Sequence, residues 1–452
     1  MTRQSIQFNL YKVITLAILG TIFFSTYGFA NWYAGTHTVV PEIMFDWEKY
    51  IPLLPWTIIP YWSIDLFYAL SILICTSQRA LYTHVKRLLT AQVICIIFFL
   101  VFPLQFSLQR PQIDGVFGLM FNTLMGFDRP FNQAPSLHIV LLIILWVFYA
   151  QRTRGILRWF VHVWSCLIGI SVLTTWQHHF IDIPTGILVA ALCIWMWPTH
   201  KPSPLAQFHF DQNKQRKKIS TYYALGSIIL CTLSLYFKPY CLWLLWPAFS
   251  LFMVSCIYAF LDVHAFQKHK NGRFSIETII LLGPYFIFAW LNSRVWTRKH
   301  PNASLICLDS LRTTQHFEIY LGRISTRHTL KKFNGLIDTC AELPVFVPRG
   351  CTYLFTPILD LTAPTLRQLE QGAKQLQYMT QILPQEHPKI LISCALGYSR
   401  SACILAAWLI YYHHVRSVQE AINLIQKSRP FVVIKDHQIQ QLEILLNLRN
   451  HD

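Results

Sequence analysis

The sequence predicts an all-α multi-span membrane helix bundle followed by an α/β domain. Of 452 residues, 54% are hydrophobic and only 13% are charged, which is too apolar for a soluble protein of this length. Long apolar runs fill residues 1–300, whereas residues 301–452 have the mixed composition of a soluble domain. In that second part strand-like and helix-like segments alternate, which is typical of a sheet covered by helices on both faces.

Nine apolar runs are candidate membrane helices. Several are shorter than the ~20 residues that a perpendicular span needs, so their boundaries are soft. The first run is longer than the apolar region of a signal peptide and is followed by further runs, which favours an uncleaved first span. The runs are Val13–Tyr33, Trp56–Cys75, Leu88–Leu108, Leu137–Ala150, Trp159–Trp176, Ile181–Trp197, Tyr222–Phe237, Cys241–Leu261 and Ile276–Leu291.

A basic segment, Lys214–Lys218, separates the first six runs from the last three. We therefore divide the chain into three parts. Residues 1–218 form a six-span membrane domain, residues 219–299 add two or three spans, and residues 300–452 form the α/β domain.

The positive charge follows the membrane part of the chain. Residues 1–300 carry 23 Lys and Arg against 10 Asp and Glu, a balance of +13, whereas residues 301–452 carry 15 against 11, a balance of +4. Basic loops of a multi-span protein explain this excess, so the expected partner is a lipid bilayer and not nucleic acid. The twelve cysteines include no Cys-x2-Cys pair, so we expect no metal and no cofactor.

The stretch Ile390–Ser401 has the features of a phosphate-binding catalytic loop. A short apolar run that reads as a buried strand ends at Cys394, and Arg400 follows in Cys-x5-Arg spacing with Gly397 between them. Five intervening residues let the loop curl so that its N–H groups surround one phosphate, which the arginine binds with two hydrogen bonds. The Cys394 thiolate then attacks phosphorus. The alternative is a buried cysteine with an arginine nearby by chance.

Asp360 is the candidate general acid. It lies 34 residues before Cys394, in the loop segment Pro357–Thr362. A carboxylic acid on a loop opposite the nucleophile can protonate the leaving alkoxide. The alternative is that Asp360 is a turn or N-cap residue of the helix that follows.

Further segments of residues 300–452 read as regular elements. Short strands are expected at Glu318–Leu321, Gly335–Thr339 and Lys389–Ile392, and helices at Ala363–Leu383, Ser401–Tyr412, Ser417–Lys427 and His437–Asn447.

Residues 315–450 resemble a dual-specificity protein phosphatase domain. The matching pieces are Ile319–Gly322, Gly335–Asp338 followed by Glu342, Asp360, the Cys394–Ser401 loop, Arg429-Pro430 and Gln441-Leu442. The resemblance implies that Cys394 is the nucleophile, Arg400 binds phosphate, Ser401 assists departure of the thiolate and Asp360 is the general acid. The family usually has His before the cysteine, where this chain has Ser393.

Four polar groups fall on the predicted external face of the membrane part. Arg110 ends the third run, His138 begins the fourth, and His178 and Asp182 lie at the junction of the fifth and sixth. Two histidines and an aspartate can transfer a phosphoryl group: one His attacks phosphorus, the carboxylate holds its ring, and the other His protonates the leaving oxygen. The alternative is that these residues cap helix ends at the interface.

Residues 88–198 resemble the type 2 phosphatidic acid phosphatase superfamily, through Arg110-Pro111, Pro135-Ser-Leu-His138 and His178-x3-Asp182. The Pro-Ser-Leu-His variant is similar to its inositolphosphoryl-transferring, lipid-synthase branch. The resemblance implies His178 as nucleophile, His138 as acid, Asp182 as orienting group and Arg110 as a phosphate ligand. The neighbouring His179 is an alternative to His178.

The whole chain looks like a bacterial fusion of these two families in the plasma (inner) membrane. We expect a multi-pass phosphatase, a phosphoric monoester hydrolase acting through a cysteinyl phosphate on lipid phosphates, with a second His/His/Asp site in the bundle. The alternatives are a protein tyrosine/serine/threonine phosphatase whose bundle is only an anchor, acting on a phosphoprotein, and a non-catalytic phosphate-binding scaffold.

Loop charges predict a cytoplasmic N-terminus and an external segment at 110–132. They leave the side of residues 300–452 open. Nine full spans put that domain outside, whereas a reactive cysteine and the basic residues Arg294, Arg298 and Lys299 favour the inside. A re-entrant ninth run, which contains Gly283-Pro284, would also place it inside.

Overall fold

The computed structural model describes residues 3–451 apart from 211, 238–239, 308–316, 384–386 and 413. The chain divides into two compact units, Met1–Ala206 and Gln207–Asp452. The helices that the sequence set apart as residues 219–299 therefore belong to the same unit as the α/β domain. The division also lies earlier than the boundary expected at residue 218.

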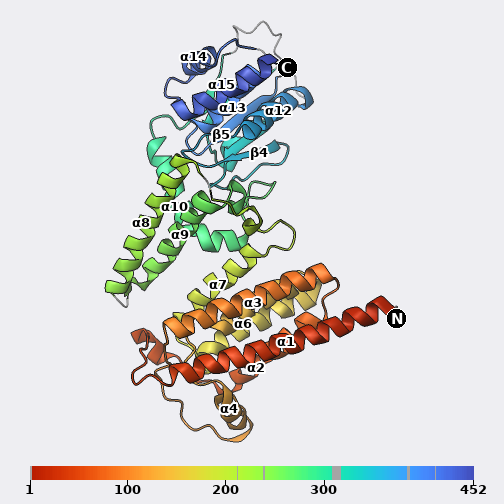
Figure 1. Cartoon of the computed structure of the whole chain (residues 1–452), viewed down its shortest axis with the longest axis vertical. Helices are drawn as coiled ribbons and strands as arrows, with labels where there is room; N and C mark the ends of the chain where they lie inside the picture. The colour runs from red at the N-terminus through yellow and green to blue at the C-terminus, as the bar shows by residue number, and fades with distance from the viewer. Residues whose placement is uncertain are drawn as a thin grey trace. The chain divides into compact units, whose positions relative to one another are not determined.

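The first unit is a bundle of α-helices around a buried helix, α5 (Leu137–Ala150) (Figure 1). Most residues of α5 are buried, which explains why it is apolar on all sides. The other helices of this unit are α1 (Arg3–Ala34), α2 (Ile58–Leu73), α3 (Gln78–Val101), α4 (Gly115–Phe127), α6 (Gly155–Thr174) and α7 (Asp182–Met196), with short 3-10 turns η1 (Asp46–Tyr50), η2 (Pro55–Thr57) and η3 (Pro204–Gln207).

Two details of this unit differ from the expected runs. Helix α3 begins ten residues before Leu88, because Ser77 caps it by accepting a hydrogen bond from the N–H of Ala80 at 3.2 Å. It ends at Val101, so Arg110 lies on the following loop and not at the end of a helix. Helix α4 was not expected at all.

Seven helices among the described residues are long and apolar enough to cross a membrane. Helices α5 and α7, expected as the fourth and sixth spans, are shorter than that length. The seven are Gln4–Ala34, Pro55–Leu73, Gln78–Val101, Gly155–Thr174, Lys214–Tyr236, Tyr240–Phe260 and Ile276–Trp296.

The second unit begins with three apolar helices, drawn in green in Figure 1: α8 (Lys214–Tyr236), α9 (Leu245–Phe260) and α10 (Ile276–Trp296), with 3-10 turns η4 (Tyr240–Leu244) and η5 (Val263–Phe266). Helices α8 and α9 form a hairpin. Its open end is closed by Arg216, which donates hydrogen bonds to the carbonyls of Ile257, Tyr258 and Leu261.

Helix α10 lies along the α/β domain. Shortly before it, the carbonyl of Gly272 accepts a hydrogen bond from the N–H of Val345 at 2.8 Å. Near its other end, Ser293 Oγ donates to the carbonyl of Ala395 at 2.6 Å, and Ala289 between them packs against a hydrophobic cluster of the domain. A helix of this length spans roughly 30 Å; the loop before it contacts the domain through Gly272, and its C-terminal part contacts the domain through Ala289 and Ser293.

The α/β domain has a five-stranded sheet in the order β1-β2-β5-β3-β4, parallel except for β1. The strands are β1 (Ser304–Leu305), β2 (Glu318–Arg323), β3 (Gly335–Cys340), β4 (Thr352–Ile358) and β5 (Lys389–Cys394). The three expected strands are present and slightly longer than expected. Strand β4, which contains Pro357, was missed because proline argues against a strand.

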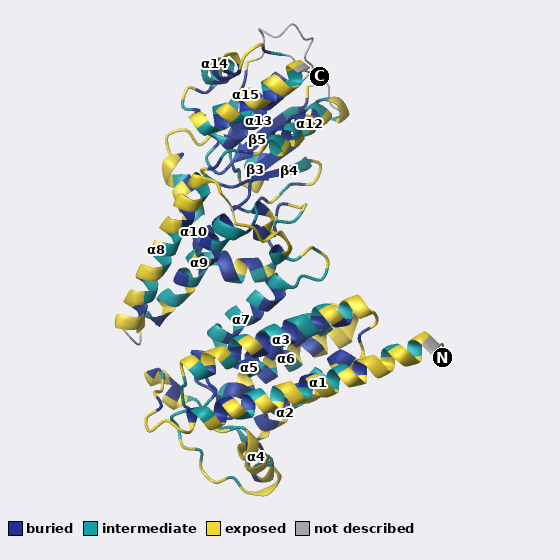
Figure 2. Ribbon diagram, viewed as in Figure 1, coloured by how far each residue is buried: buried dark blue, intermediate teal, exposed yellow. Residues whose placement is uncertain are grey.

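Helices α12 (Leu366–Ile382) and α13 (Arg400–Tyr411) cover one face of this sheet, and α14 (Val418–Ser428) and α15 (Asp436–His451) pack onto α13. The short α11 (Arg327–Leu330) and α10 contribute to the cluster on the other face. Strands β3 and β5 are buried almost throughout (Figure 2). Their side chains are apolar on both faces because each face is covered, and this core fixes the loop that follows β5.

Candidate functional site

The expected catalytic loop lies between the end of β5 and the start of α13. The Cys394 side chain is 2% exposed. Its Sγ accepts a hydrogen bond from the N–H of Gly397 at 3.1 Å and one from the hydroxyl of Ser401 at 3.5 Å. Gly397 has φ +74°, where a side chain is disfavoured, so glycine allows the loop to turn back toward the sulfur.

Opposing effects act on the Cys394 thiol. Burial raises its pKa, but the Arg400 charge and the hydrogen bonds from Ser401 and Gly397 outweigh burial and lower the pKa below the usual thiol value. The N-terminus of α13 adds a favourable dipole. The site therefore favours the thiolate, the form that attacks phosphorus.

Arg400 is held by a carboxylate that the sequence interpretation had not given a role. Its Nη1 and Nη2 donate to the two oxygens of Glu342 at 2.8 and 2.6 Å, and Nη1 also donates to the carbonyl of Ile358 at 2.9 Å. Glu342 is buried, yet the Arg400 charge overcomes the effect of burial and lowers the pKa of its carboxyl. This two-pronged pair fixes the guanidinium plane beside the loop.

Asp360 lies in the same site. Its Oδ1 is 3.0 Å from Arg400 Nη2, and its side chain is 37% exposed. Burial, reinforced by the neighbouring Glu342 charge, raises the pKa of Asp360 despite the attraction of Arg400. Asp360 begins a turn after β4, but the N-cap of α12 is Thr365. The Asp360 carboxyl thus lies beside Arg400 and does not cap α12.

Residues distant in sequence form hydrogen bonds with the Cys394–Arg400 loop. Arg429 Nε donates to the carbonyl of Gly397 at 3.0 Å, and Ser399 Oγ donates to Gln438 Oε1 at 2.8 Å. Ser393, which stands where histidine is usual, is buried, and its carbonyl accepts a hydrogen bond from Thr339 Oγ1 at 2.9 Å. Arg429 was noted only as part of a matching motif, and Gln438 was missed because no local pattern marks it.

Helices α8–α10 reach both loops of this site. The Tyr258 hydroxyl donates to the carbonyl of Asp360 at 3.1 Å, and Gln215 Nε2 donates to the carbonyl of Leu361 at 3.4 Å. On the other side, Ser293 bonds the carbonyl of Ala395, the residue after the cysteine. The phosphatase-like site is therefore contacted by the very helices that the sequence assigns to the membrane.

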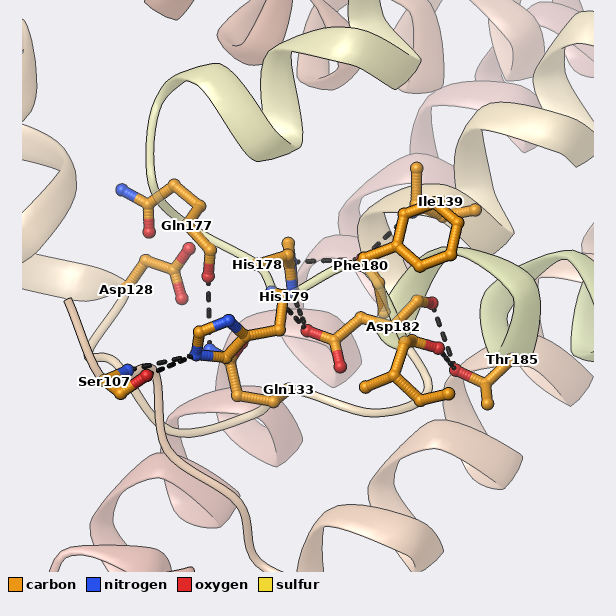
Figure 3. Close-up of polar contacts among 12 residues, drawn as sticks. Ser107, Asp128, Gln133, Ile139, Gln177, His178, His179, Phe180, Asp182 and Thr185 are labelled. Atoms are coloured by element: carbon orange, nitrogen blue, oxygen red, sulfur yellow. Dashed lines mark hydrogen bonds and ion pairs between the residues drawn. The ribbon is translucent and has the colours of Figure 1, made fainter. Parts of the chain in front are cut away.

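The first unit brings together His178 and Asp182, as expected (Figure 3). His178 Nδ1 lies 3.0 Å from Asp182 Oδ2, and its Nε2 lies 3.0 Å from the hydroxyl of Ser136. Asp182 Oδ2 also accepts the N–H of His179 at 3.1 Å. Since a carboxylate can only accept, His178 carries its proton on Nδ1 and presents Nε2 as a base toward Ser136.

His179 has a different environment from its neighbour. Its Nδ1 lies 3.0 Å from Glu48 Oε2, and its Nε2 lies 2.8 Å from Ser107 Oγ and accepts the N–H of Ser107 at 3.1 Å. Both ring nitrogens are thus engaged in fixing two loops to each other. Each of the two rings therefore has a carboxylate at Nδ1 and a serine hydroxyl at Nε2, and the carboxylate of His178 comes from the His-x3-Asp segment itself.

His138 and Arg110 stand near this pair. The His138 ring stacks on Tyr61 with ring centroids 4.1 Å apart. Within the described residues its Nε2 is buried without a hydrogen-bond partner. Arg110 donates from Nε and Nη2 to the carbonyls of Thr175 and Trp176 at 3.1 and 2.9 Å. These bonds use one edge of the guanidinium.

A cavity of about 880 Å³ adjoins the constellation. Arg110 and Gln177 line it together with polar residues of the loop before α4, among them Ser107 and Gln109. An unexpected carboxylate, Asp128, lies nearby and accepts hydrogen bonds from the hydroxyls of Tyr27 and Tyr61 at 2.7 and 3.3 Å. No sequence motif marked Asp128, because its two partners lie on separate helices, α1 and α2.

Comparison with known proteins identifies one family in the second unit. The family model described as "Dual specificity phosphatase, catalytic domain" matches residues 325–445. Dual specificity protein phosphatase 14 of Homo sapiens and that of Bos taurus are each 28% identical to this chain over 120 residues. This match covers 25% of this chain and 58% of each relative, so the chain spans only that share of their length.

Solved structures of related proteins align with the same region. PTPMT1 in complex with PI(5)P is 22% identical, covers 29% of this chain and 92% of its own, and gives a TM-score of 0.26. Tk-PTP in the active form is 26% identical, covers 32% of this chain and 97% of its own, and gives a TM-score of 0.27.

Proposed function

Given that residues 325–445 form a dual-specificity phosphatase catalytic domain, we propose that this phosphatase is an integral-membrane enzyme that hydrolyses phosphate monoesters of membrane lipids. The observation that carries the proposal is the Cys394 sulfur, which accepts hydrogen bonds from Gly397 and Ser401 beside Arg400 and Asp360. This arrangement supplies a nucleophile, a phosphate ligand and a proton donor in one place.

The reaction has two steps. The Cys394 thiolate attacks phosphorus, the ester P–O bond breaks, and Asp360 gives its proton to the departing alkoxide. Water then attacks the cysteinyl phosphate while the Asp360 carboxylate accepts a proton from it. The S–P bond breaks, and the Ser401 hydroxyl donates a hydrogen bond to the returning thiolate. Arg400 and the loop N–H groups hold the phosphate oxygens throughout.

Lipid phosphates are favoured by the position of the apolar helices. Helices α8, α9 and α10 contact the loops of both Asp360 and Cys394, so embedding these helices holds the site close to the lipid head groups. Confinement at the bilayer raises the effective concentration of a lipid substrate relative to a soluble one.

The phosphatase domain then belongs on the cytoplasmic face of a multi-pass inner-membrane protein. The loop before α10 and the C-terminal part of α10 both contact that domain, which supports an α10 that does not carry the chain across a bilayer that α8 and α9 cross. The open end of that hairpin, where Arg216 lies among the basic residues of Lys214–Lys218, is on the domain's side. Basic residues accumulate on the cytoplasmic side, and a reducing compartment protects a thiolate.

A second site in the first unit is supported by the His178–Asp182 pair. The Nε2 atom of His178 is a base, and His138 lies close to His178. The cavity beside Arg110 offers room for a phosphorylated head group. We propose that this site transfers or hydrolyses a lipid phosphate group, with His178 as nucleophile, His138 as acid, Asp182 as orienting group and Arg110 as phosphate ligand.

One set of assays separates these functions. Full-length protein in lipid nanodiscs is offered phosphatidic acid, phosphatidylglycerophosphate and a phosphotyrosine peptide, as the native chain, Cys394→Ser, His178→Ala and the double variant. We expect Cys394→Ser to remove most lipid-phosphate hydrolysis and His178→Ala to remove the remainder. The Cys394 assignment is wrong if Cys394→Ser keeps native activity.

The other outcomes identify the alternatives. If only the phosphopeptide is hydrolysed, and Cys394→Ser removes that activity completely, the bundle is an anchor for a protein phosphatase. If no substrate is turned over but inorganic phosphate still binds, the chain is a non-catalytic phosphate-binding scaffold.

A further inference from the structure

The loop that carries Asp360 contains an energetically unfavourable backbone conformation. Leu361, the next residue, has φ +58°, in the left-handed region that side chains other than glycine rarely adopt. Such a conformation persists where surrounding contacts determine it. The contacts that hold the two carbonyls of this turn come from the apolar helices: Tyr258 binds that of Asp360 and Gln215 binds that of Leu361.

Tyr258 makes this contact from a buried position in α9. It is 1% exposed, near the C-terminal end of α9, and its ring lies 5.8 Å from that of Tyr223 on α8. The direction of the Asp360 side chain thus depends on a peptide unit that α9 holds in place.

The phosphate-binding loop is held in a similar way. Ser293 of α10, also 1% exposed, donates to the carbonyl of Ala395 at 2.6 Å. In a trans peptide the carbonyl and the following N–H point in opposite directions. By binding the Ala395 carbonyl, Ser293 fixes the plane of the Ala395–Leu396 peptide and with it the direction of the Leu396 N–H, one of the N–H groups of the phosphate-binding loop.

We propose that helices α8–α10 complete the phosphatase site, with Tyr258 as a positioning residue for the general acid and Ser293 as a positioning residue for the phosphate-binding loop. The proposal rests on the proposed roles of Asp360 and Cys394. It assigns the apolar helices a part in catalysis beyond attachment to the membrane. The two residues act on different steps, so their substitution has different kinetic signatures.

Tyr258→Phe removes one hydroxyl and keeps the ring. In full-length protein, we expect its kcat for benzyl phosphate, whose alkoxide needs a proton, to fall about three- to tenfold, the size of one lost hydrogen bond. Hydrolysis of p-nitrophenyl phosphate, whose leaving group needs little protonation, stays within about twofold. Asp360→Asn is expected to lower kcat for benzyl phosphate by roughly 100-fold with the same selectivity between the two substrates. The double variant Asp360→Asn/Tyr258→Phe is expected to lose no more activity than Asp360→Asn alone.

Ser293→Ala has the other signature. Both substrates lose about the same factor in kcat/KM, roughly two- to tenfold, because the phosphate group is common to them. Inhibition by vanadate, which binds in the same loop, weakens by a similar factor. The ratio of the two substrates' rates is unchanged, in contrast to Tyr258→Phe.

Two matched variants serve as controls. Tyr222→Phe removes a phenol of α8 that is 61% exposed, and Ser234→Ala removes a buried hydroxyl of α8 without a hydrogen-bond partner in the described part of the chain. Both are expected to behave like the native chain. Equal losses on both substrates in Tyr258→Phe, with a lower melting temperature, would overturn the positioning role. If Asp360→Asn itself slows both substrates equally, Asp360 is not the general acid, and the positioning role proposed for Tyr258 fails as well.

Discussion

At the scale of single residues, the phosphatase site holds two ionisable groups with pKa values displaced toward each other. The charge of Arg400 and local hydrogen bonds lower the pKa of Cys394, whereas burial and Glu342 raise that of Asp360. The form needed for the first step has an ionised Cys394 and a protonated Asp360. Displacing the two values in these directions increases the population of that form near neutral pH.

This displacement predicts the pH profile of kcat/KM for an alkyl phosphate. Activity should rise with pH as Cys394 ionises, and fall as Asp360 loses its proton. Asp360→Asn should remove the falling limb and leave the rising one. The measurement is a pH series at constant ionic strength on the full-length native chain and on its Asp360→Asn variant. A falling limb that persists in Asp360→Asn would assign it to another group.

A second prediction concerns the buried pair of Arg400 and Glu342. Glu342→Ala removes the two-pronged partner of the buried Arg400, which keeps only Asp360 and the carbonyl of Ile358. Breaking such a buried pair costs about 3 kcal/mol and should lower the melting temperature by roughly 6–12 °C. Because the pKa of folded Glu342 is depressed, the stability it supplies is present at neutral pH and is lost as pH falls through that depressed value. Thermal unfolding in detergent at pH 7 tests this, and an unchanged midpoint would contradict it.

The sequence could indicate some of these residues and not others. Cys394, Arg400, Ser401 and Asp360 were found because they lie in one loop or at a recognisable distance from it. Glu342 acquires its role only when β3 and β5 pair in parallel and bring their carboxyl ends to one edge. Tyr258 lies in an apolar run where a tyrosine looks like any other lipid-facing or core residue.

At the scale of elements, the turn at Gly397 is the most constrained point of the catalytic loop. A Cβ there would lie 2.3 Å from the carbonyl carbon of Gly322 and 2.5 Å from its oxygen, at φ +74°. Gly397, in the loop after β5, therefore approaches Gly322 of β2 so closely that a side chain on Gly397 would collide with the backbone of that strand.

Gly397→Ala should accordingly abolish phosphatase activity and weaken vanadate binding at least tenfold. The control is Gly350→Ala, where φ is +85° but nothing lies within 4 Å of the added carbon. That change is expected to cost only the ~1–2 kcal/mol of a left-handed residue and to preserve activity. Equal behaviour of the two variants would show that the close approach to Gly322 is not needed.

The elements themselves were predicted best where periodicity is strong. The strands at Glu318, Gly335 and Lys389 and the four helices after residue 363 are present with small shifts of their ends. Helix α4 was missed because a short apolar segment between loops lacks a distinct period. The length of α10 predicted a span, but the contacts of its C-terminal part and of the loop before it come from tertiary packing, which hydropathy does not report.

At the scale of the whole molecule, the packing of α10 predicts the side of the phosphatase domain. If the domain lies in the cytoplasm, as we propose, a C-terminal fusion of green fluorescent protein should fluoresce and an alkaline phosphatase fusion should be inactive. Exposed Cys307 should react with a membrane-impermeant maleimide only in inverted vesicles. Active alkaline phosphatase without fluorescence would place the domain outside and require α10 to cross.

The same packing has a consequence for how the enzyme meets its substrate. If α8–α10 are embedded in a bilayer, as we propose, the domain that they contact at the loops of its own catalytic site does not search for its substrate in three dimensions. Turnover is then governed by lateral diffusion and by the mole fraction of substrate among the surrounding lipids. Diluting proteoliposomes tenfold should leave the rate per enzyme unchanged, whereas adding inert lipid at constant total substrate should lower it in proportion.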